Sequence, residues 1–184
     1  MKLGPRYKMP FKRRFEDKTD YKKRLGLLLS GKSRLVIRTS TKHVQVQVIK
    51  YEPEGDKTLL SAHTQELKGM GWKHSTSNIP AAYLTGLLIG KKAKKKKIKS
   101  LVVDFGPQRI VKSSRLFSVL KGAIDAGLDV SCSEEVLPTE ERLKGEHIVK
   151  YSEGKNVPKN QFSKVKPKNL GKDIEKIKKK IMKD

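Results

Sequence analysis

The amino-acid sequence predicts an α/β fold organised around a mixed sheet of about five strands. Between residues 98 and 138 the hydrophobic pattern changes from a short apolar run to helical spacing and then to two-residue alternation, as in a strand, a helix and a second strand. Between residues 33 and 62, alternating segments separated by short turns are typical of an antiparallel meander. A helix that connects two strands normally sets them parallel, so we expect a meander followed by a βαβ unit.

The βαβ unit can be assigned in detail. The uninterrupted apolar run at 98–103 favours a strand that is covered on both faces. From Ser113 onward apolar residues recur at helical spacing, with Ser113 or Ser114 available as the N-cap and Gly127 as a left-handed C-cap. Residues 128–132 then alternate between apolar and polar side chains, which predicts the second strand.

The meander is expected to contain a hairpin and a third strand. Alternation at 35–38 and 44–49 predicts two antiparallel strands, and the turn at 53–56 leads to a third strand around 59–62. The short connection between the first two strands is rich in hydrogen-bond donors suited to phosphate or ribose 2′-hydroxyl groups, although an ordinary polar turn is the alternative. These residues are Thr39, Ser40, Thr41, Lys42 and His43.

Helices are expected beside these strands. Ile79–Ile89 has a proline in its first turn, and the small residues Ala82 and Gly86 would permit close approach to one sheet face. A run of lysines at 91–99 follows at the helix end, where the helix dipole favours cations. Trp72 lies in the preceding loop and is expected to be a packing anchor rather than a ligand platform.

The C-terminal part of the chain has two helical patterns separated by an aperiodic stretch. Pro138 opens a helix that runs toward Tyr151, and residues 152–168 then form a linker or a second basic arm. The last pattern is a narrow aliphatic stripe among lysines, which we expect to dock on this core or on a neighbour. The stripe consists of Leu170, Ile174, Ile177 and Ile181.

Composition points to a nucleic-acid partner. The chain has 184 residues, 43 Lys and Arg against 19 Asp and Glu, and a formal net charge of +24, which disfavours compaction unless counter-charge arrives from a ligand such as phosphate.

Cys132 is the single cysteine, which excludes an intrachain disulfide and favours a core residue over a nucleophile. The longest apolar stretch is too short to span a bilayer, so we expect a soluble, cytoplasmic protein.

The chain divides into a basic arm at 1–29, an α/β core at 30–137 and a helical, basic extension at 138–184. Ordering the arm costs roughly 1–2 kcal/mol per residue, more than burial of its few aromatic rings returns, so we expect it to be largely disordered without RNA. With RNA, its cations meet phosphates and its rings stack on bases; a merely solvated tail is the alternative. The candidate RNA-binding residues are Arg6, Tyr7, Lys8, Lys12, Arg13, Arg14, Lys18, Tyr21, Lys22, Lys23 and Arg24 in the arm, and Ser40, Thr41, Lys42 and His43 at the hairpin.

Signatures of catalysis are weak. Asp104-Phe105-Gly106 matches three letters of the kinase magnesium motif, but the catalytic and glycine-rich loops of kinases do not accompany it. A nuclease would require Asp104 with Asp125 or Asp129 to converge on a metal pair, and the scattered histidines lack metal-ligand spacing. A membrane-surface protein is a third alternative, although the helix at 170–181 lacks interfacial aromatic residues. We expect no enzyme activity, cofactor or small-molecule substrate.

Several blocks occur in one order and together resemble a known family. They are Gly4-Pro5-Arg6-Tyr7, Lys18–Leu25, Ser40–Val44, Ile79–Gly86, Lys121–Leu128 and Gly145–Ile148. Taken jointly, they resemble the large-subunit ribosomal protein L-eighteen family in its archaeal form, whose eukaryotic counterpart is called ribosomal protein L-five. The similarity extends from Gly4 to Tyr151.

This resemblance implies a three-layer sheet of the ribonuclease-H-like type without nuclease activity. It also implies binding of 5S rRNA in the central protuberance of the ribosome, with contacts to large-subunit rRNA and to neighbouring large-subunit ribosomal proteins. The family's basic arm corresponds to Arg6–Arg24 and its RNA-facing hairpin to Arg38–His43.

Overall fold

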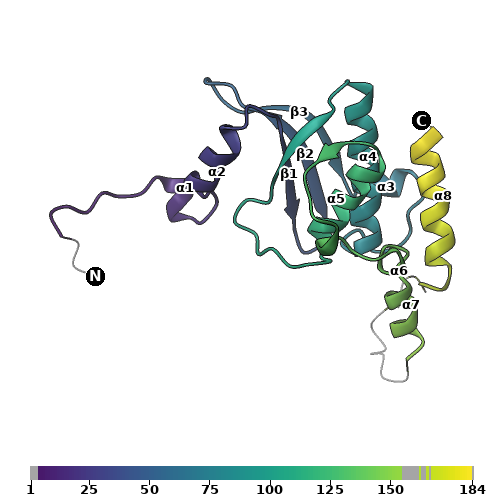
Figure 1. Cartoon of the computed structure of the whole chain (residues 1–184). Helices are drawn as coiled ribbons and strands as arrows, with labels where there is room; N and C mark the ends of the chain where they lie inside the picture. The colour runs from purple at the N-terminus through teal and green to yellow at the C-terminus, as the bar shows by residue number, and fades with distance from the viewer. Residues whose placement is uncertain (1–3, 155–161, 163–164, 166, 184) are drawn as a thin grey trace.

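The described strands form one mixed sheet. A computed structural model of the chain describes residues 4–154, 162, 165 and 167–183, and in this part of the chain five strands pair in the order β3-β2-β1-β4-β5. β1 is antiparallel to β2 (Figure 1) and parallel to β4, and β4 is parallel to β5. The predicted α/β fold, a meander followed by a βαβ unit, is therefore confirmed. The strands are β1 (Arg34–Thr39), β2 (Val44–Lys50), β3 (Lys57–His63), β4 (Ser100–Asp104) and β5 (Asp129–Val130).

The second half of the sheet is less regular than the sequence suggested. β5 contains two residues, because it is an edge strand that pairs with Ser100 and Leu101 alone, so the prediction of a strand over 128–132 was too long. In β4 Leu101 is buried, whereas Val102 and Val103 are half-buried. The prediction that this strand is covered on both faces is thus wrong for its C-terminal end, which borders the open side of the sheet.

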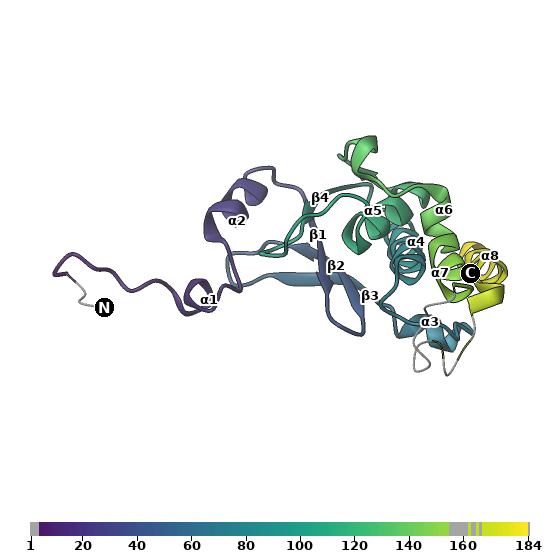
Figure 2. The same cartoon turned by 90° about the horizontal axis from the view of Figure 1, so that it is seen from below.

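Two helices cover the opposite face of the sheet. α4 (Ile79–Lys95) and α5 (Arg115–Asp125) lie side by side there, and Figure 2 shows them on the side of the strands away from α2 (Tyr21–Leu28). Gly86 is essential to this packing, because a Cβ atom there would overlap the carbonyl group of Val119 in α5. Gly86 therefore permits close approach to a helix, while α4 also contacts β2 and β3, and α4 continues into the lysine run that was expected to follow it.

The predicted caps of α5 are confirmed in position. Ser114 is the N-cap residue, although its side chain forms no capping hydrogen bond, and Gly127 follows the helix with φ +90°. Trp72 is buried and its indole Nε1 donates to the Ser75 carbonyl at 3.0 Å, so it is the expected packing anchor. A short helix, α3 (Glu66–Gly69), precedes it.

The helix predicted after Pro138 is broken in two. α6 (Glu140–Leu143) and α7 (Glu146–Ser152) are separated at Gly145, which adopts a left-handed conformation with φ +75°. Glycine adopts this conformation without strain, and the side chain of Leu170 lies so close that a Cβ atom at residue 145 would clash with it. Most of the aperiodic stretch predicted at 152–168 lies outside the described residues, which include the short turn η2 (Pro167–Asn169).

The C-terminal helix docks on the core, as its stripe predicted. α8 (Leu170–Lys183) packs against α4, and all four aliphatic residues of the stripe are at most 4% exposed. Polar contacts fix its orientation: His74 and Asp173 lie 3.0 Å apart, and Lys91 donates to the carbonyl group of Ile181.

The N-terminal segment contains more regular structure than expected. The prediction that residues 1–29 lack regular structure on their own is wrong for α1 (Lys12–Phe15) and α2. α2 forms because the Asp20 carboxylate accepts hydrogen bonds from the backbone amides of Lys22 and Lys23, at 3.0 and 3.1 Å. Arg24 then ties α2 to Asp56 before β3 at 2.9 Å, a long-range contact that no local pattern reveals.

Candidate nucleic-acid interface

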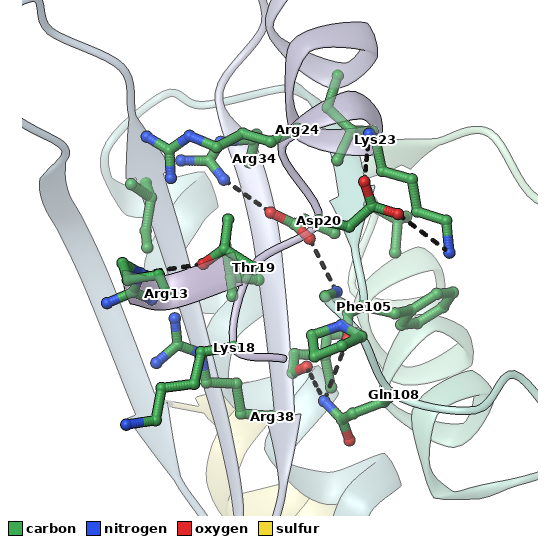
Figure 3. A pocket seen from close by; sticks show the side chains of 18 of the residues that line it. Arg13, Lys18, Thr19, Asp20, Lys23, Arg24, Arg34, Arg38, Phe105 and Gln108 are labelled. Atoms are coloured by element: carbon green, nitrogen blue, oxygen red, sulfur yellow. Dashed lines mark hydrogen bonds and ion pairs between the residues drawn. The ribbon is translucent and has the colours of Figure 1, made fainter. Parts of the chain in front are cut away.

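A groove lies between α2 and the open face of the sheet. Its volume is about 1060 Å³, and Figure 3 shows arginine and lysine side chains entering it from the N-terminal segment and from β1. Arg34, Val36 and Arg38 of β1 form its floor, because alternate residues of a strand share one face. The opposite wall is formed by the end of β4, from Val103, and by the loop that follows it as far as Ile110. We call this hollow the α2 groove.

Arg34 is the buried centre of the α2 groove. Its side chain is 4% exposed and donates to Asp104 of β4 and to Asp56, both at 2.7 Å. Asp56 also forms an ion pair with Arg24, so two guanidinium groups share its carboxylate. Arg34 was not among the predicted site residues, since a single arginine at the start of an apolar strand resembles an edge residue. Arg24 was predicted to bind RNA, whereas its side chain pairs with Asp56 in the structure.

Other predicted cations line the α2 groove with weaker internal partners. Arg13 donates from Nε to the Thr19 hydroxyl at 2.9 Å, and Lys18 lies 2.7 Å from Glu16 in an exposed pair. Exposed ion pairs of this kind contribute little, so these cations can exchange their partners for phosphate. Arg38 is exposed near the end of β1, and its side chain forms no hydrogen bond or ion pair within the described residues. Lys23 also lines the groove, 3.9 Å from Asp20.

Gln108 shapes the end of the α2 groove nearest the hairpin. Its side-chain amide nitrogen donates to the Ile37 carbonyl at 2.8 Å, while its oxygen accepts from the backbone amide of Thr39 at 3.1 Å. These bonds fix the loop after β4 against β1. The same loop exposes Ile110 and Val111, beside Arg109 and Lys112, none of which the sequence analysis singled out. The sequence of a loop has no hydrophobic periodicity, so it does not indicate which of the loop's side chains will be exposed.

The remaining arm residues lie outside the α2 groove. The arm extends away from the core in both views, and its aromatic rings remain exposed, from 37% for Tyr21 to 74% for Phe11 (Figures 1 and 2). Phe11 and Tyr21 touch, with ring centroids 5.5 Å apart. Seven of the predicted arm residues do not line the groove; these are Arg6, Tyr7, Lys8, Lys12, Arg14, Tyr21 and Lys22.

The hairpin tip belongs to a second, smaller hollow. Thr41, Lys42 and His43 line it, and its volume is about 780 Å³. Ser40 does not present a free donor, because its hydroxyl closes the turn by donating to the His43 carbonyl at 3.0 Å. Arg115 of α5 holds the tip in place by donating to the Ser40 carbonyl at 3.1 Å.

His43 is held as a neutral ring. Its Nδ1 lies 3.1 Å from the Thr76 hydroxyl, and its ring packs on His63 with centroids 4.9 Å apart. Burial, followed by the nearby charges of His63, Lys68 and Lys42, lowers the pKa of His43 below its usual value of 6.5. His43 therefore contributes hydrogen bonding and packing to the hairpin rather than a positive charge.

The carboxylates considered for a nuclease do not converge. Asp104 pairs with Arg34 and also accepts from the Gly106 amide at 2.9 Å, whereas Asp125 accepts from the Tyr83 hydroxyl at 2.9 Å on another layer of the fold. Within the described residues, no three His, Cys, Asp or Glu side chains gather closely enough to hold a metal ion. No described helix is both long and apolar enough to cross a bilayer.

Comparison with known proteins connects this cationic surface to a family. Residues 5–102 match the family described as ribosomal large subunit proteins 60S L5 and 50S L18. The chain belongs to this family. It is 45% identical over 191 residues to large ribosomal subunit protein uL18 of Methanococcus maripaludis, with 99% of both chains covered. It is 47% identical over 188 residues to the uL18 of Methanothermobacter thermautotrophicus, with 98% of both covered.

Family membership confirms the resemblance read from the sequence blocks. The family consists of structural ribosomal proteins, so the chain is a constituent of the large ribosomal subunit in the cytoplasm and not an enzyme. The family match ends within β4, but the two relatives are similar along almost the whole chain, including α5 and α8.

Proposed function

We propose that this chain binds 5S rRNA and attaches it to large-subunit rRNA in the central protuberance of the ribosome. The observation that carries this proposal is the α2 groove, where cations from the N-terminal segment and from β1 face one hollow. Phosphate groups supply the counter-charge that a chain of net charge +24 requires. Neighbouring large-subunit ribosomal proteins are proposed as further partners.

The sheet and the arm have different tasks in this proposal. Arg34, Asp56 and Asp104 brace the groove from within, so Arg38, Arg13 and Lys23 of α2 meet the RNA backbone from a fixed platform. The arm beyond α1 wraps the RNA, and its exposed rings stack on unpaired bases. The hairpin tip contributes through Thr41 and Lys42, whose side chains line the second hollow.

The proposed domain division changes at one boundary. The arm proper ends before Asp20, because α2 is tied to the core through Arg24 and forms a wall of the α2 groove. The core and the extension at 138–184 remain as predicted units, and the extension contacts the core through Leu143 and the stripe of α8.

Competitive binding tests the choice of RNA. Labelled 5S rRNA is titrated with the full chain in the presence of unlabelled 5S rRNA or of an unrelated structured RNA of the same length. We expect 5S rRNA to compete at least tenfold better, since base stacking and groove shape add to charge. Replacing Tyr7, Phe11 and Phe15 with alanine should reduce this preference while preserving the charge. Equal competition by both RNAs would show that the chain binds RNA without selecting 5S rRNA.

A further inference from the structure

Helix α8 carries two rows of side chains with opposite character. The aliphatic row is buried against α4, and a row of lysines repeats its spacing two residues later along the chain. Two residues correspond to about 200° of helical rotation, so the lysine row points away from the core. We call it the α8 lysine row; it consists of Lys172, Lys176, Lys179 and Lys183, and each of these is exposed.

The lysines of α8 fall into two groups. Lys178 donates to the Tyr83 hydroxyl at 3.2 Å, and Lys180 donates to the Met70 carbonyl at 2.9 Å, so both fold back onto the core. The side chains of the four members of the α8 lysine row form no hydrogen bond or ion pair with another residue in the described part of the chain. Their charges are therefore available to a partner.

The stability of α8 does not explain the α8 lysine row. Lys172 stands in the first turn, where the helix dipole disfavours a cation, and like charges three and four residues apart repel each other along the row. Of the acidic residues in the described helix, Asp173 is engaged with His74, which leaves Glu175 to offset the row. A polyanion would remove the repulsion by binding along the helix.

Nucleic acid fits this surface better than a protein does. The cores of protein interfaces are depleted in lysine and depend on buried apolar or aromatic anchors, whereas Met182 is the sole exposed apolar side chain of α8 among the described residues. The row is about 16 Å long at the rise of an α-helix. A nucleic-acid duplex carries roughly one negative charge per 1.7 Å of its axis, so several phosphates lie within reach of such a row.

We propose that the α8 lysine row binds the phosphate backbone of a large-subunit rRNA segment, separate from the RNA held in the α2 groove. α8 lies on the far side of α4 from the sheet, whereas α1 and α2 lie beyond the opposite face, as both views show (Figures 1 and 2). Two cationic surfaces at opposite ends allow one chain to join two RNA segments. The inference rests on the proposed function, because it takes the RNA in the α2 groove to be 5S rRNA.

Charge removal along α8 tests the proposal. The row variant replaces Lys172, Lys176, Lys179 and Lys183 with glutamine, which keeps helix propensity. The matched control replaces four exposed lysines scattered over other elements with glutamine, namely Lys94, Lys99, Lys144 and Lys150. Each protein is first titrated with purified 5S rRNA. Its preformed complex with 5S rRNA is then titrated with purified large-subunit rRNA at several salt concentrations.

The row variant should bind 5S rRNA within about twofold of the unmodified chain, while the affinity of its complex for large-subunit rRNA falls at least tenfold. The slope of log affinity against log salt should flatten by about three units, since each lost phosphate contact removes roughly 0.7–0.9. The scattered control should change either affinity less than threefold. Equal losses in both variants, loss of 5S rRNA affinity in the row variant, or no binding of large-subunit rRNA by the unmodified complex would overturn the proposal. Failure of the unmodified chain to select 5S rRNA would instead contradict the proposed function.

Discussion

Arg34 of β1 donates from Nη1 to the Asp104 carboxylate of β4 at 2.7 Å, so a buried ion pair joins the two parallel strands at the centre of the sheet. The second terminal nitrogen of Arg34 binds Asp56 at the same distance, and Asp56 binds Arg24 of α2. One guanidinium group therefore links the sheet to the helix that walls the α2 groove. The groove is preformed by this network before any RNA enters it.

Replacement of Arg34 by alanine should destabilise the fold by about 3 kcal/mol, because two partly buried carboxylates lose their cation. The free energy of unfolding from urea titration measures this. Arg38→Ala is the matched control on the same face of β1, and its exposed side chain should cost less than about 0.5 kcal/mol. A similar cost for both variants would show that the network does not brace the groove.

The close contact between α4 and α5 predicts that one added methyl group at Gly86 will destabilise the fold. Gly86→Ala should lower the free energy of unfolding by about 1–3 kcal/mol or more, since the new Cβ atom overlaps the Val119 carbonyl group. Gly26→Ala in α2 provides the control, because no atom lies within 4 Å of its Cβ position. That variant should be neutral or more stable by up to roughly 1 kcal/mol. Thermal unfolding of both variants would decide the point.

Docking of α8 can be tested through its aliphatic stripe. Ile177 is 3% exposed, so Ile177→Ala should cost about 2–5 kcal/mol and increase amide hydrogen exchange across the helix. Met182 lies on the same helix but is 55% exposed, and Met182→Ala should leave exchange unchanged. If Ile177→Ala also leaves exchange in α8 unchanged, the helix is not held by its stripe.

The lowered pKa of His43 predicts how the free energy of unfolding depends on pH. Its pKa is lowered in the folded state, so the unfolded chain binds more protons between that lowered value and 6.5. The contribution of His43 to stability is therefore complete above 6.5 and declines as the pH falls through this window. NMR titration of the His43 ring should give a midpoint below 6.5, and His43→Gln should reduce the acid-side loss. A midpoint at or above 6.5 would contradict the neutral ring described here.

The regular parts of the fold could be predicted because local patterns determine them. The hairpin, α5 and the stripe of α8 each follow a two-residue or helical period that burial imposes on the sequence. The hydrophobic pattern after Pro138 did not reveal the break at Gly145, and the close contact of Gly145 with Leu170 could not be predicted because Leu170 is distant in the chain. The short β5 likewise reflects where its neighbour β4 ends and not its own alternation.

The candidate site was predicted in composition but not in arrangement. Arg13, Lys18 and Lys23 were predicted from the charge of the N-terminal segment and Arg38 from the family resemblance, and all four lie around one groove. Arg24 has the same charge but points to Asp56, and only the fold brings these two residues together. The regular structure of the N-terminal segment was underestimated, because an average entropy cost per residue ignores a specific cap. The hydrogen bonds that Asp20 accepts at the N-terminus of α2 stabilise that helix.

The most direct test of the central claim is the salt dependence of 5S rRNA affinity when the α2 groove loses its charge. The groove variant replaces Arg13, Lys18, Lys23 and Arg38 with glutamine, and the scattered lysine variant described above is its control. If the groove binds 5S rRNA phosphates, the groove variant should lose at least tenfold in affinity, and its log–log salt slope should flatten by about three units. The control should keep both values close to those of the unmodified chain. An unchanged affinity and slope in the groove variant would contradict the assignment of the α2 groove as the 5S rRNA site.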